Sequence, residues 1–150
     1  MKNLFDPGAP EDVKRRVLEL RADSVRQWGR MTVAQMLAHL ANAFEMAVGD
    51  ARPPRMFAGR ILGGLGRAFV LGNDKPMLRN TATVPMLSIV DPRDLERERA
   101  RLLTLMDRFT SGGPAGVTTH PHSFFGRMTP QQWAVLMYKH LDHHLRQFGV

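Results

Sequence analysis

Apolar residues recur every three or four positions along four stretches of the chain, which is the repeat of an amphipathic helix. In the clearest stretch, Leu102, Met106 and Phe109 fall on one apolar stripe. Strand signals are few, and the sequence favours at most short extended pieces around Thr81–Ile89. The pattern therefore predicts an all-α four-helix bundle. We expect its helices over Glu11–Arg26, Val33–Val48, Asp91–Phe109 and Pro130–Gln147.

Two of these helices begin with the same short motif. An aromatic residue and Gly-Arg-Met-Thr are followed by Gln three positions after the Thr, once in Trp28–Gln35 and once in Phe125–Gln132. The Thr hydroxyl of such a capping box accepts from a free amide of the first turn, and the Gln side chain reaches back to the cap. The third helix is expected to start with Asp91 as its cap and Pro92 at its first position, and to stop at Ser111–Pro114.

Residues 49–90 do not fit a minimal four-helix pattern. The apolar run Met56–Leu71 predicts an extra helical segment, which Arg60 and Arg67 interrupt and which is too short to span a membrane. Gly63–Gly66 does not indicate a phosphate loop, because no strand precedes it and no Lys-Ser/Thr follows. Two roles are open for the segment. It closes one end of the bundle or a dimer interface, or it forms a wall or lid of a substrate pocket.

Composition narrows the class of protein. The chain has 150 residues, the size of one ordinary domain, and we expect a single helical domain over 1–150. It contains no cysteine, so any metal must be held by imidazole, carboxylate or water. The net charge of +7 comes from basic residues spread along the chain without interleaved aromatics, and we expect no nucleic-acid partner. No signal peptide is visible, which favours the cytoplasm, and no membrane partner is expected.

The candidate chemistry lies in the histidines. A helix places His140 and His144 about 40° apart on one face, and Gln147 continues that stripe. Two imidazoles in this register can bind one metal ion, and His39, in the apolar segment Met36–Ala41, is the candidate third ligand. Three histidines with open positions describe a catalytic metal site better than a structural one. The alternative is that His39 is a hydrogen-bonded core residue. Gln147 either orients an imidazole or satisfies carbonyls at the helix end.

Other polar residues have simpler interpretations. His143 lies on the flank of the stripe, where it acts as a general base beside the metal or forms a hydrogen bond at the bundle edge. His120 and His122 precede the last helix in a loop, and we expect them to be exposed, at most on the rim of a pocket. Glu45 is expected at the surface, on the side of its helix away from His39. The charged residues within Glu96–Arg101 are expected to form a solvated face.

With these residues in place, the chain resembles the DinB/YfiT-like superfamily of metal-dependent enzymes. That family carries one His on its second helix and an His-x-x-x-His pair on its last, often with a Gln three positions further on. The matching residues here are His39 in Met36–Leu40 and the run His140–Gln147. His122–Thr129 resembles a branch described as a domain of unknown function, and the similarity extends over nearly the whole chain. The resemblance implies a metal on His39, His140 and His144.

The resemblance also implies a class of activity. Members with known activities include thiol-cofactor S-transferases, a thiol-dependent isomerase and metal-dependent hydrolases, commonly with zinc or nickel and frequently as dimers. We therefore expect a homodimer in which a divalent metal, zinc or nickel, activates water or an external low-molecular-weight thiol towards a small-molecule substrate. His143 and Gln147 are the candidates to act beside the metal. The rival interpretation is a non-enzymatic helical module that binds a metal or ligand, or that dimerises.

Overall fold

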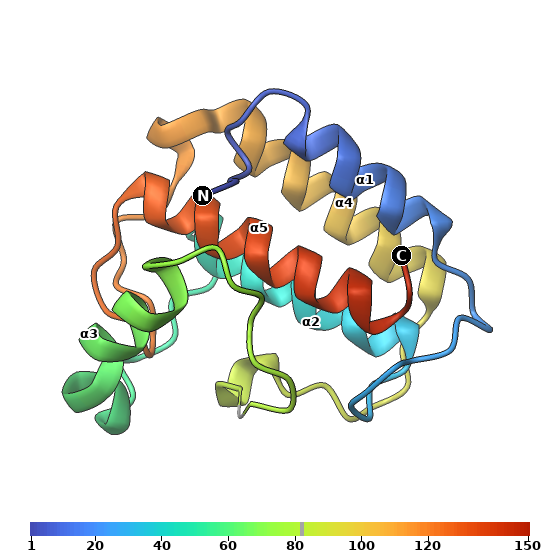
Figure 1. The fold of residues 1–150 in the computed structure, drawn as a ribbon, viewed down its shortest axis with the longest axis horizontal. Helices are drawn as coiled ribbons and strands as arrows, with labels where there is room; N and C mark the ends of the chain where they lie inside the picture. Colours follow the sequence, from blue (N-terminus) through green and yellow to red (C-terminus); the bar gives the residue numbers. More distant parts are fainter. Residues whose placement is uncertain (82) are drawn as a thin grey trace.

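Five α-helices and two short 3-10 helices form the secondary structure of residues 1–81 and 83–150, which the computed structural model describes (Figure 1). The elements are α1 (Ala9–Glu19), α2 (Val33–Val48), α3 (Phe57–Leu71), η1 (Pro85–Leu87), α4 (Leu95–Gly112), η2 (Gly113–Gly116) and α5 (Pro130–Gln147). Within this part of the chain there is no β-strand, and one isolated bridge pairs His122 with Gly126. The prediction of an all-α protein is confirmed.

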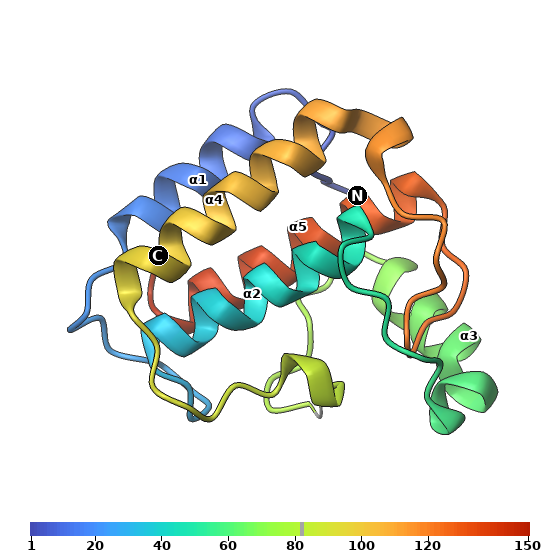
Figure 2. The same cartoon turned by 180° about the vertical axis from the view of Figure 1, so that it is seen from behind.

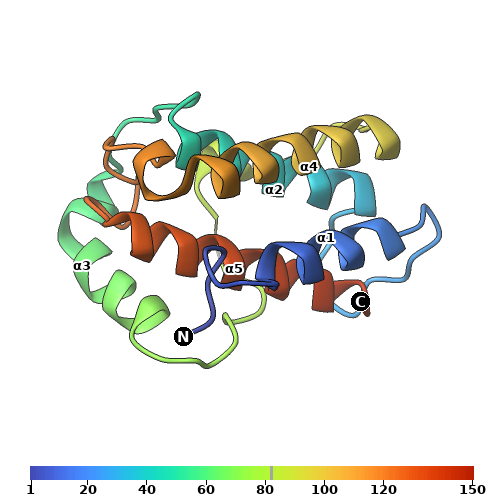
Figure 3. The same ribbon diagram turned by 90° about the horizontal axis from the view of Figure 1, so that it is seen from above.

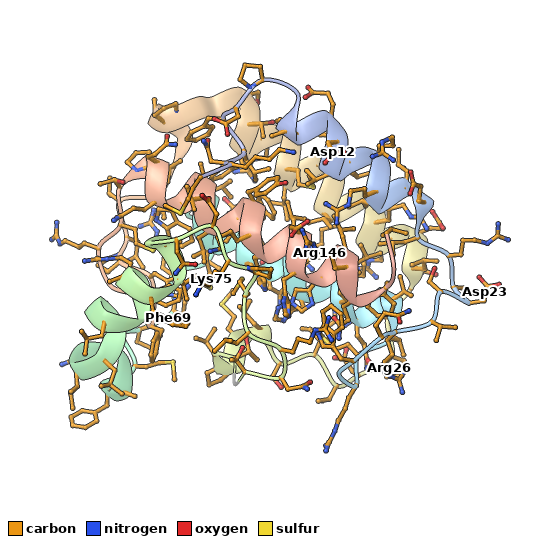
Figure 4. The ribbon with its side chains drawn as sticks, viewed as in Figure 1. Asp12, Asp23, Arg26, Phe69, Lys75 and Arg146 are labelled. Carbon is orange, nitrogen blue, oxygen red and sulfur yellow. The ribbon has the colours of Figure 1, made fainter. Side chains whose placement is uncertain are left out.

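Four of the helices pack around a common apolar core. α2 contacts α4 and α5, and α1 contacts the same two helices from the other side. Figure 3 shows this arrangement from above, with α2 beside α4 and α1 beside α5. Side chains fill the space between the ribbons (Figure 4). The centre of the core is formed by residues with no exposed surface, among them Leu37, Phe44, Leu102, Phe109 and Leu141.

The two capping boxes predicted from the repeated motif are both present. The Thr32 hydroxyl accepts from the Gln35 amide at 3.2 Å, and the Gln35 side chain accepts from the Thr32 amide at 2.9 Å. Thr129 and Gln132 form the same two hydrogen bonds at the same distances. Each box satisfies two backbone donors at a helix start, so α2 and α5 begin at fixed residues.

The first helix is shorter than predicted. We expected Glu11–Arg26, but α1 ends at Glu19 because Leu20 adopts an extended conformation. The guanidinium of Arg99 on α4 donates to the carbonyl oxygens of Leu18 and Leu20, at 3.1 and 2.7 Å. A side chain from another helix therefore satisfies carbonyls that a longer helix would have bonded internally.

The third predicted helix starts later than its Asp91-Pro92 signal indicated. Asp94 is the cap of α4, and its carboxylate accepts from the Arg97 amide at 2.8 Å. The Asp91 carboxylate pairs instead with Arg93 at 3.0 Å, so it is not available as a cap. The predicted stop at Ser111–Pro114 agrees with the end of α4 at Gly112.

The prediction that the charged residues of α4 form a solvated face is wrong for Glu98, in the middle of that face. Glu98 is 4% exposed, and its carboxylate pairs with Arg93 at 3.3 Å and with Arg101 at 3.0 Å. Arg101 also binds Glu45 at 2.6 Å and Asn42 at 2.7 Å, both on α2. Glu45 is therefore half-buried in an ion-pair network between α2 and α4 and is not a free surface residue. Two helices whose apolar faces already meet bring these charges within reach of one another.

The extra helical segment predicted over Met56–Leu71 is present as α3, with Met56 as its N-cap. α3 contacts α5 and stands at one end of the molecule (Figure 2). No helix in the described part of the chain is both long and apolar enough to cross a bilayer. The stretch expected to be extended, Thr81–Ile89, contains η1, and its residue Ala82 lies outside the described residues.

Removing bulk from the core is expected to destabilise the protein strongly. Leu102→Ala and Phe109→Ala each lower the free energy of unfolding by about 2–5 kcal/mol, because each leaves a cavity. The Phe109 ring packs against those of Phe5 and Phe44 at centroid distances of 5.3 and 5.6 Å. Urea unfolding followed by circular dichroism measures the loss. Leu18→Ala, at a residue 58% exposed on α1, is the control and changes stability by at most about 0.5 kcal/mol. A similar loss in all three variants would contradict this account of the core.

Candidate metal centre

Three histidines from two helices meet between α2 and α5. His39 lies in the middle of α2, and His140 and His144 lie one turn apart on α5. Their ring centroids are 4.7, 4.8 and 4.9 Å apart, and one nitrogen of each ring lies within 4.8 Å of the others. His39 and His144 are buried, at 4% and 7% exposure, whereas His140 is partly exposed. The expected convergence of the three rings is present, and all three side chains are buried where they meet.

The protonation of the His39 ring follows from its hydrogen bond to a backbone carbonyl. Nδ1 of His39 lies 2.7 Å from the carbonyl oxygen of Leu87, at the end of η1. A carbonyl oxygen only accepts, so Nδ1 carries the proton and donates it. In the neutral ring, Nε2 then has a free lone pair, and it faces His140. The carbonyl thus orients this imidazole as a ligand, which is how ligating histidines are commonly held.

Gln147 holds His144 in the same way. Nδ1 of His144 lies 2.8 Å from Oε1 of Gln147, and Nε2 of Gln147 donates to the carbonyl oxygen of Trp28 at 2.7 Å. Because the Gln147 amide nitrogen is occupied by Trp28, its oxygen is the acceptor and His144 is the donor. Gly29 makes this approach possible. Its φ is +78°, and a Cβ there would collide with Nε2 of Gln147.

Burial keeps all three imidazoles neutral. It lowers the pKa of His144 to about 3, with a smaller effect from the neighbouring His39. Burial likewise lowers the pKa of His39, and burial followed by the nearby His39 and His144 lowers that of His140. Nε2 of His39 and Nε2 of His140 are 2.8 Å apart. Since Nε2 of His39 has the lone pair, His140 donates in this contact.

The donor set fits a transition metal. Three neutral imidazole nitrogens suit zinc, nickel, copper or iron, whereas calcium and magnesium require oxygen ligands. No carboxylate belongs to the cluster found in the described residues, so His39, His140 and His144 are the groups that could hold an ion.

His143, Trp28 and Arg79 lie beside the cluster. The His143 ring is 5.0 Å from that of His144 and 5.5 Å from that of Trp28, measured between centroids. The guanidinium of Arg79 lies over the Trp28 ring, with Cζ 4.0 Å from the ring centroid. Burial lowers the pKa of His143, a hydrogen bond that the ring donates to the backbone of Met77 raises it, and the charge of Arg79 lowers it. The structure therefore places His143 next to the three histidines but outside the set that could share an ion.

The expectation that both loop histidines are exposed is wrong for His122. Its side chain is 8% exposed, and Nδ1 accepts from the amides of Phe124 and Phe125 at 3.1 Å each. His122 and Gly126 also exchange backbone hydrogen bonds of 2.9 and 3.0 Å, so the ring closes a tight turn. His120 is half-buried, and its Nε2 lies 3.2 Å from the carbonyl oxygen of Pro53. Neither belongs to the cluster of three.

Two groups that orient the histidines were not expected from the sequence. Both are backbone carbonyls, those of Leu87 and Trp28, and any residue type could provide them. The one usable signal was Gly29 in the repeated motif, since a glycine outside a helix can mark a position where another group approaches the backbone closely.

Comparison with known proteins gives a family and no activity. The model of one family, described as "Protein of unknown function (DUF1569)", matches residues 7–149. No curated protein and no solved structure matches the chain.

The buried His122 is expected to make stability depend on pH. Burial and the charge of Arg55 lower the pKa of folded His122 to about 4, whereas an unfolded histidine takes up a proton below about 6.5. The unfolded chain therefore binds more protons in this window. The free energy of unfolding falls as the pH drops from about 6.5 to 4, by up to about 1.4 kcal/mol per pH unit for this residue.

His122→Asn isolates this contribution, because the Asn side-chain oxygen can accept from the same two amides and does not titrate. Urea unfolding of both proteins between about pH 7 and pH 4.5 measures it. The wild type is expected to lose stability relative to the variant as the pH falls. Equal pH dependence of the two proteins would show that His122 takes up its proton at the same pH in the folded and in the unfolded chain.

Proposed function

Because the chain belongs to the DUF1569 family, whose function is unknown, we propose a function from its own geometry. It is a metal-dependent enzyme that holds one divalent ion on His39, His140 and His144 and acts on a small molecule. The observation that carries this proposal is the orientation of the imidazoles. His39 and His144 are each fixed through Nδ1, which leaves both Nε2 lone pairs for an ion. Such fixed ligands are what a catalytic metal site needs.

The fold proposed for this function is the DinB/YfiT-like four-helix bundle in a single domain. The contacts among α1, α2, α4 and α5 support it, because each of these helices packs against two others. The placement of one histidine on α2 and two on the last helix also supports it. In such bundles, metal ligands project inward from facing helices.

Zinc or nickel is the proposed ion, and when bound it would lower the pKa of a water or thiol to near neutral. Three protein ligands leave positions for exogenous ligands. The chain has no cysteine, so thiol chemistry would use an external low-molecular-weight thiol. Hydrolysis and thiol transfer are the two reaction types that this site supports.

The residues around the cluster have proposed roles of their own. His143 is half-buried beside His144, and its lowered pKa keeps it neutral at pH 7, so it can accept a proton there. Gln147 is a positioning residue, since it acts through His144. Arg79 lies at the exposed side near Trp28, where its charge favours an anionic substrate.

The second candidate function is a non-enzymatic module in which the three histidines only stabilise the packing of α2 on α5. The 2.8 Å contact between His39 and His140 favours it, because the rings already satisfy one another without an ion. The two functions differ in metal content. A stoichiometric ion with activity towards esters, amides or thiol-dependent substrates supports the enzyme, and an ion-free, inert protein supports the module.

Replacing one of the three histidines is expected to abolish metal binding and to leave the fold intact. His144→Ala should abolish stoichiometric binding of zinc or nickel, because two imidazoles make a poor site. Helix packing supplies most of the stability, so the variant stays folded. Elemental analysis after equilibrium dialysis, together with thermal unfolding, tests both statements. His120→Ala is the matched control and keeps the metal. Outright unfolding of His144→Ala would show that the histidines are structural.

Removing the Gln147 side-chain amide is expected to weaken metal binding without abolishing it. Gln147→Leu has a similar volume but cannot accept from Nδ1 of His144, so the ring loses its fixed orientation. Metal affinity should fall by about 10–100-fold, as measured by competition with a chromogenic chelator. Gln131→Leu, which removes an exposed side-chain amide of the same type at the other end of α5, is the control. Unchanged affinity in Gln147→Leu would exclude this role.

A further inference from the structure

α3 presents its apolar face to solvent. Five of its side chains are large, apolar and more than half exposed: Phe57 at 79%, Ile61 at 65%, Leu62 at 52%, Leu65 at 73% and Phe69 at 60%. At 100° per residue, the four residues spaced by four cover an arc of about 120°, and Leu62 widens it. Figure 4 labels Phe69 on this helix, at the end of the molecule. An amphipathic helix normally buries this face.

The opposite face of α3 is made of glycines. A Cβ at Gly59 or Gly63 would collide with the backbone of Phe124, and one at Gly66 would press on the Phe124 ring. The glycines therefore let the helix backbone lie directly on the turn that His122 closes. α3 is fixed to the molecule by its small residues, and its large residues are left without a partner inside the described part of the chain.

The exposed face has the size of an interface. The five exposed fractions correspond to on the order of 600–700 Å² of apolar surface. This is at or above the largest patch of a typical monomer and close to the roughly 800 Å² that each partner buries in a standard interface.

The order of side chains on this face makes the face complementary to a second copy of itself. Phe57, Ile61, Leu65 and Phe69 form one ridge of the i, i+4 type, with aromatic rings at both ends and aliphatic residues in the middle. Reversing the helix leaves this order of shapes unchanged. Two copies in antiparallel orientation therefore place like beside like, as a two-fold interface requires.

We propose that α3 pairs with α3 of a second copy in antiparallel orientation, with Phe57 against Phe69 and Ile61 against Leu65. The two-fold axis crosses the exposed face at the level of Gly63 and Gly64, midway between Ile61 and Leu65 along the helix. Aromatic pairs would then close both ends of an aliphatic centre.

The charges on the helix favour a second copy over a lipid surface. Helices that lie on anionic membranes carry a row of free basic residues beside the apolar face. Here Arg67 donates to the carbonyl oxygens of Phe125 and Arg127 and is turned towards the protein. Arg60 is exposed, but it lies at the edge of the apolar arc. The arc itself carries no charge, so neither attraction to lipid head groups nor repulsion between copies dominates.

Pairing of α3 with a second copy would also affect the part of α5 next to His140, because α3 is hydrogen-bonded to it. Nζ of Lys139 donates to the carbonyl oxygens of Val70 and Asn73, at 2.7 and 2.9 Å, and so ties the end of α3 to the residue before His140. The pairing itself needs no metal, so its test is independent of the proposed activity.

The first test is the mass in solution, measured by light scattering during gel filtration. The wild type is expected at twice the chain mass of 16.9 kDa. Ile61→Glu combined with Leu65→Glu should give a folded monomer, checked by circular dichroism. Leu18→Glu combined with Val25→Glu, at exposed apolar positions elsewhere, should remain dimeric. A monomeric wild type, or a dimeric Ile61/Leu65 variant, would overturn the proposal. So would a monomeric wild type that floats with phosphatidylglycerol vesicles, which would assign the face to lipid.

The second test uses the absence of native cysteine, so that any disulfide links two chains. Gly64 has open space where a Cβ would lie and is near the proposed axis, so Gly64→Cys should form a disulfide dimer under mild oxidation. Gly112→Cys, equally open at the end of α4, should not. Phe57→Cys should link to chains carrying Phe69→Cys and not to itself. Self-linking of Phe57→Cys would indicate parallel helices, and equal linking of the two glycine variants would indicate random collision. Either result would refute the antiparallel pair.

Discussion

The candidate metal centre of this protein depends on keeping three imidazoles uncharged in one small space. Nε2 of His39 and of His140 are 2.8 Å apart, and protonating both rings would place two positive charges at that distance. Burial between α2 and α5 favours the neutral forms, and the two acceptors at Nδ1 determine which nitrogen keeps the proton. Helix packing therefore sets the protonation state as well as the positions of the rings. That state makes them suitable as ligands.

Much of the fold and the candidate cluster could be predicted, because local rules apply to helices. The spacing of His140 and His144 places them on one face, and the capping boxes at Thr32 and Thr129 fix where the helices begin. What could not be predicted came from contacts between distant parts of the chain. The end of α1 is set by Arg99 on α4, and the ring of His39 is oriented by a carbonyl of η1. A periodic pattern contains no information about such partners.

α3 shows a second limit of the pattern. Its apolar period predicts a helix, but the direction of the apolar face is decided by which side can approach the rest of the protein most closely. Gly59 and Gly63 allow contact with a backbone, and larger residues would not. His122 also departs from the rule that polar loop residues are exposed, because its ring is buried where it completes a turn. In both places, a close backbone approach overrides the expectation from hydrophobicity.

The repeated motif makes the position of His144 depend on the length of the segment before α2. Gly29 and Gly126 both have φ close to +79°, each stands three residues before a capping Thr, and each leaves space that a side chain from elsewhere occupies. At Gly29 that side chain is Gln147, which holds His144. An insertion between Gly29 and Thr32 would therefore shift the anchor of His144 relative to the start of α2. The three-residue spacing therefore fixes the distance between this anchor and the start of α2. Among homologues we expect gaps to accumulate in the largely exposed residues 21–26 and to avoid these three-residue intervals.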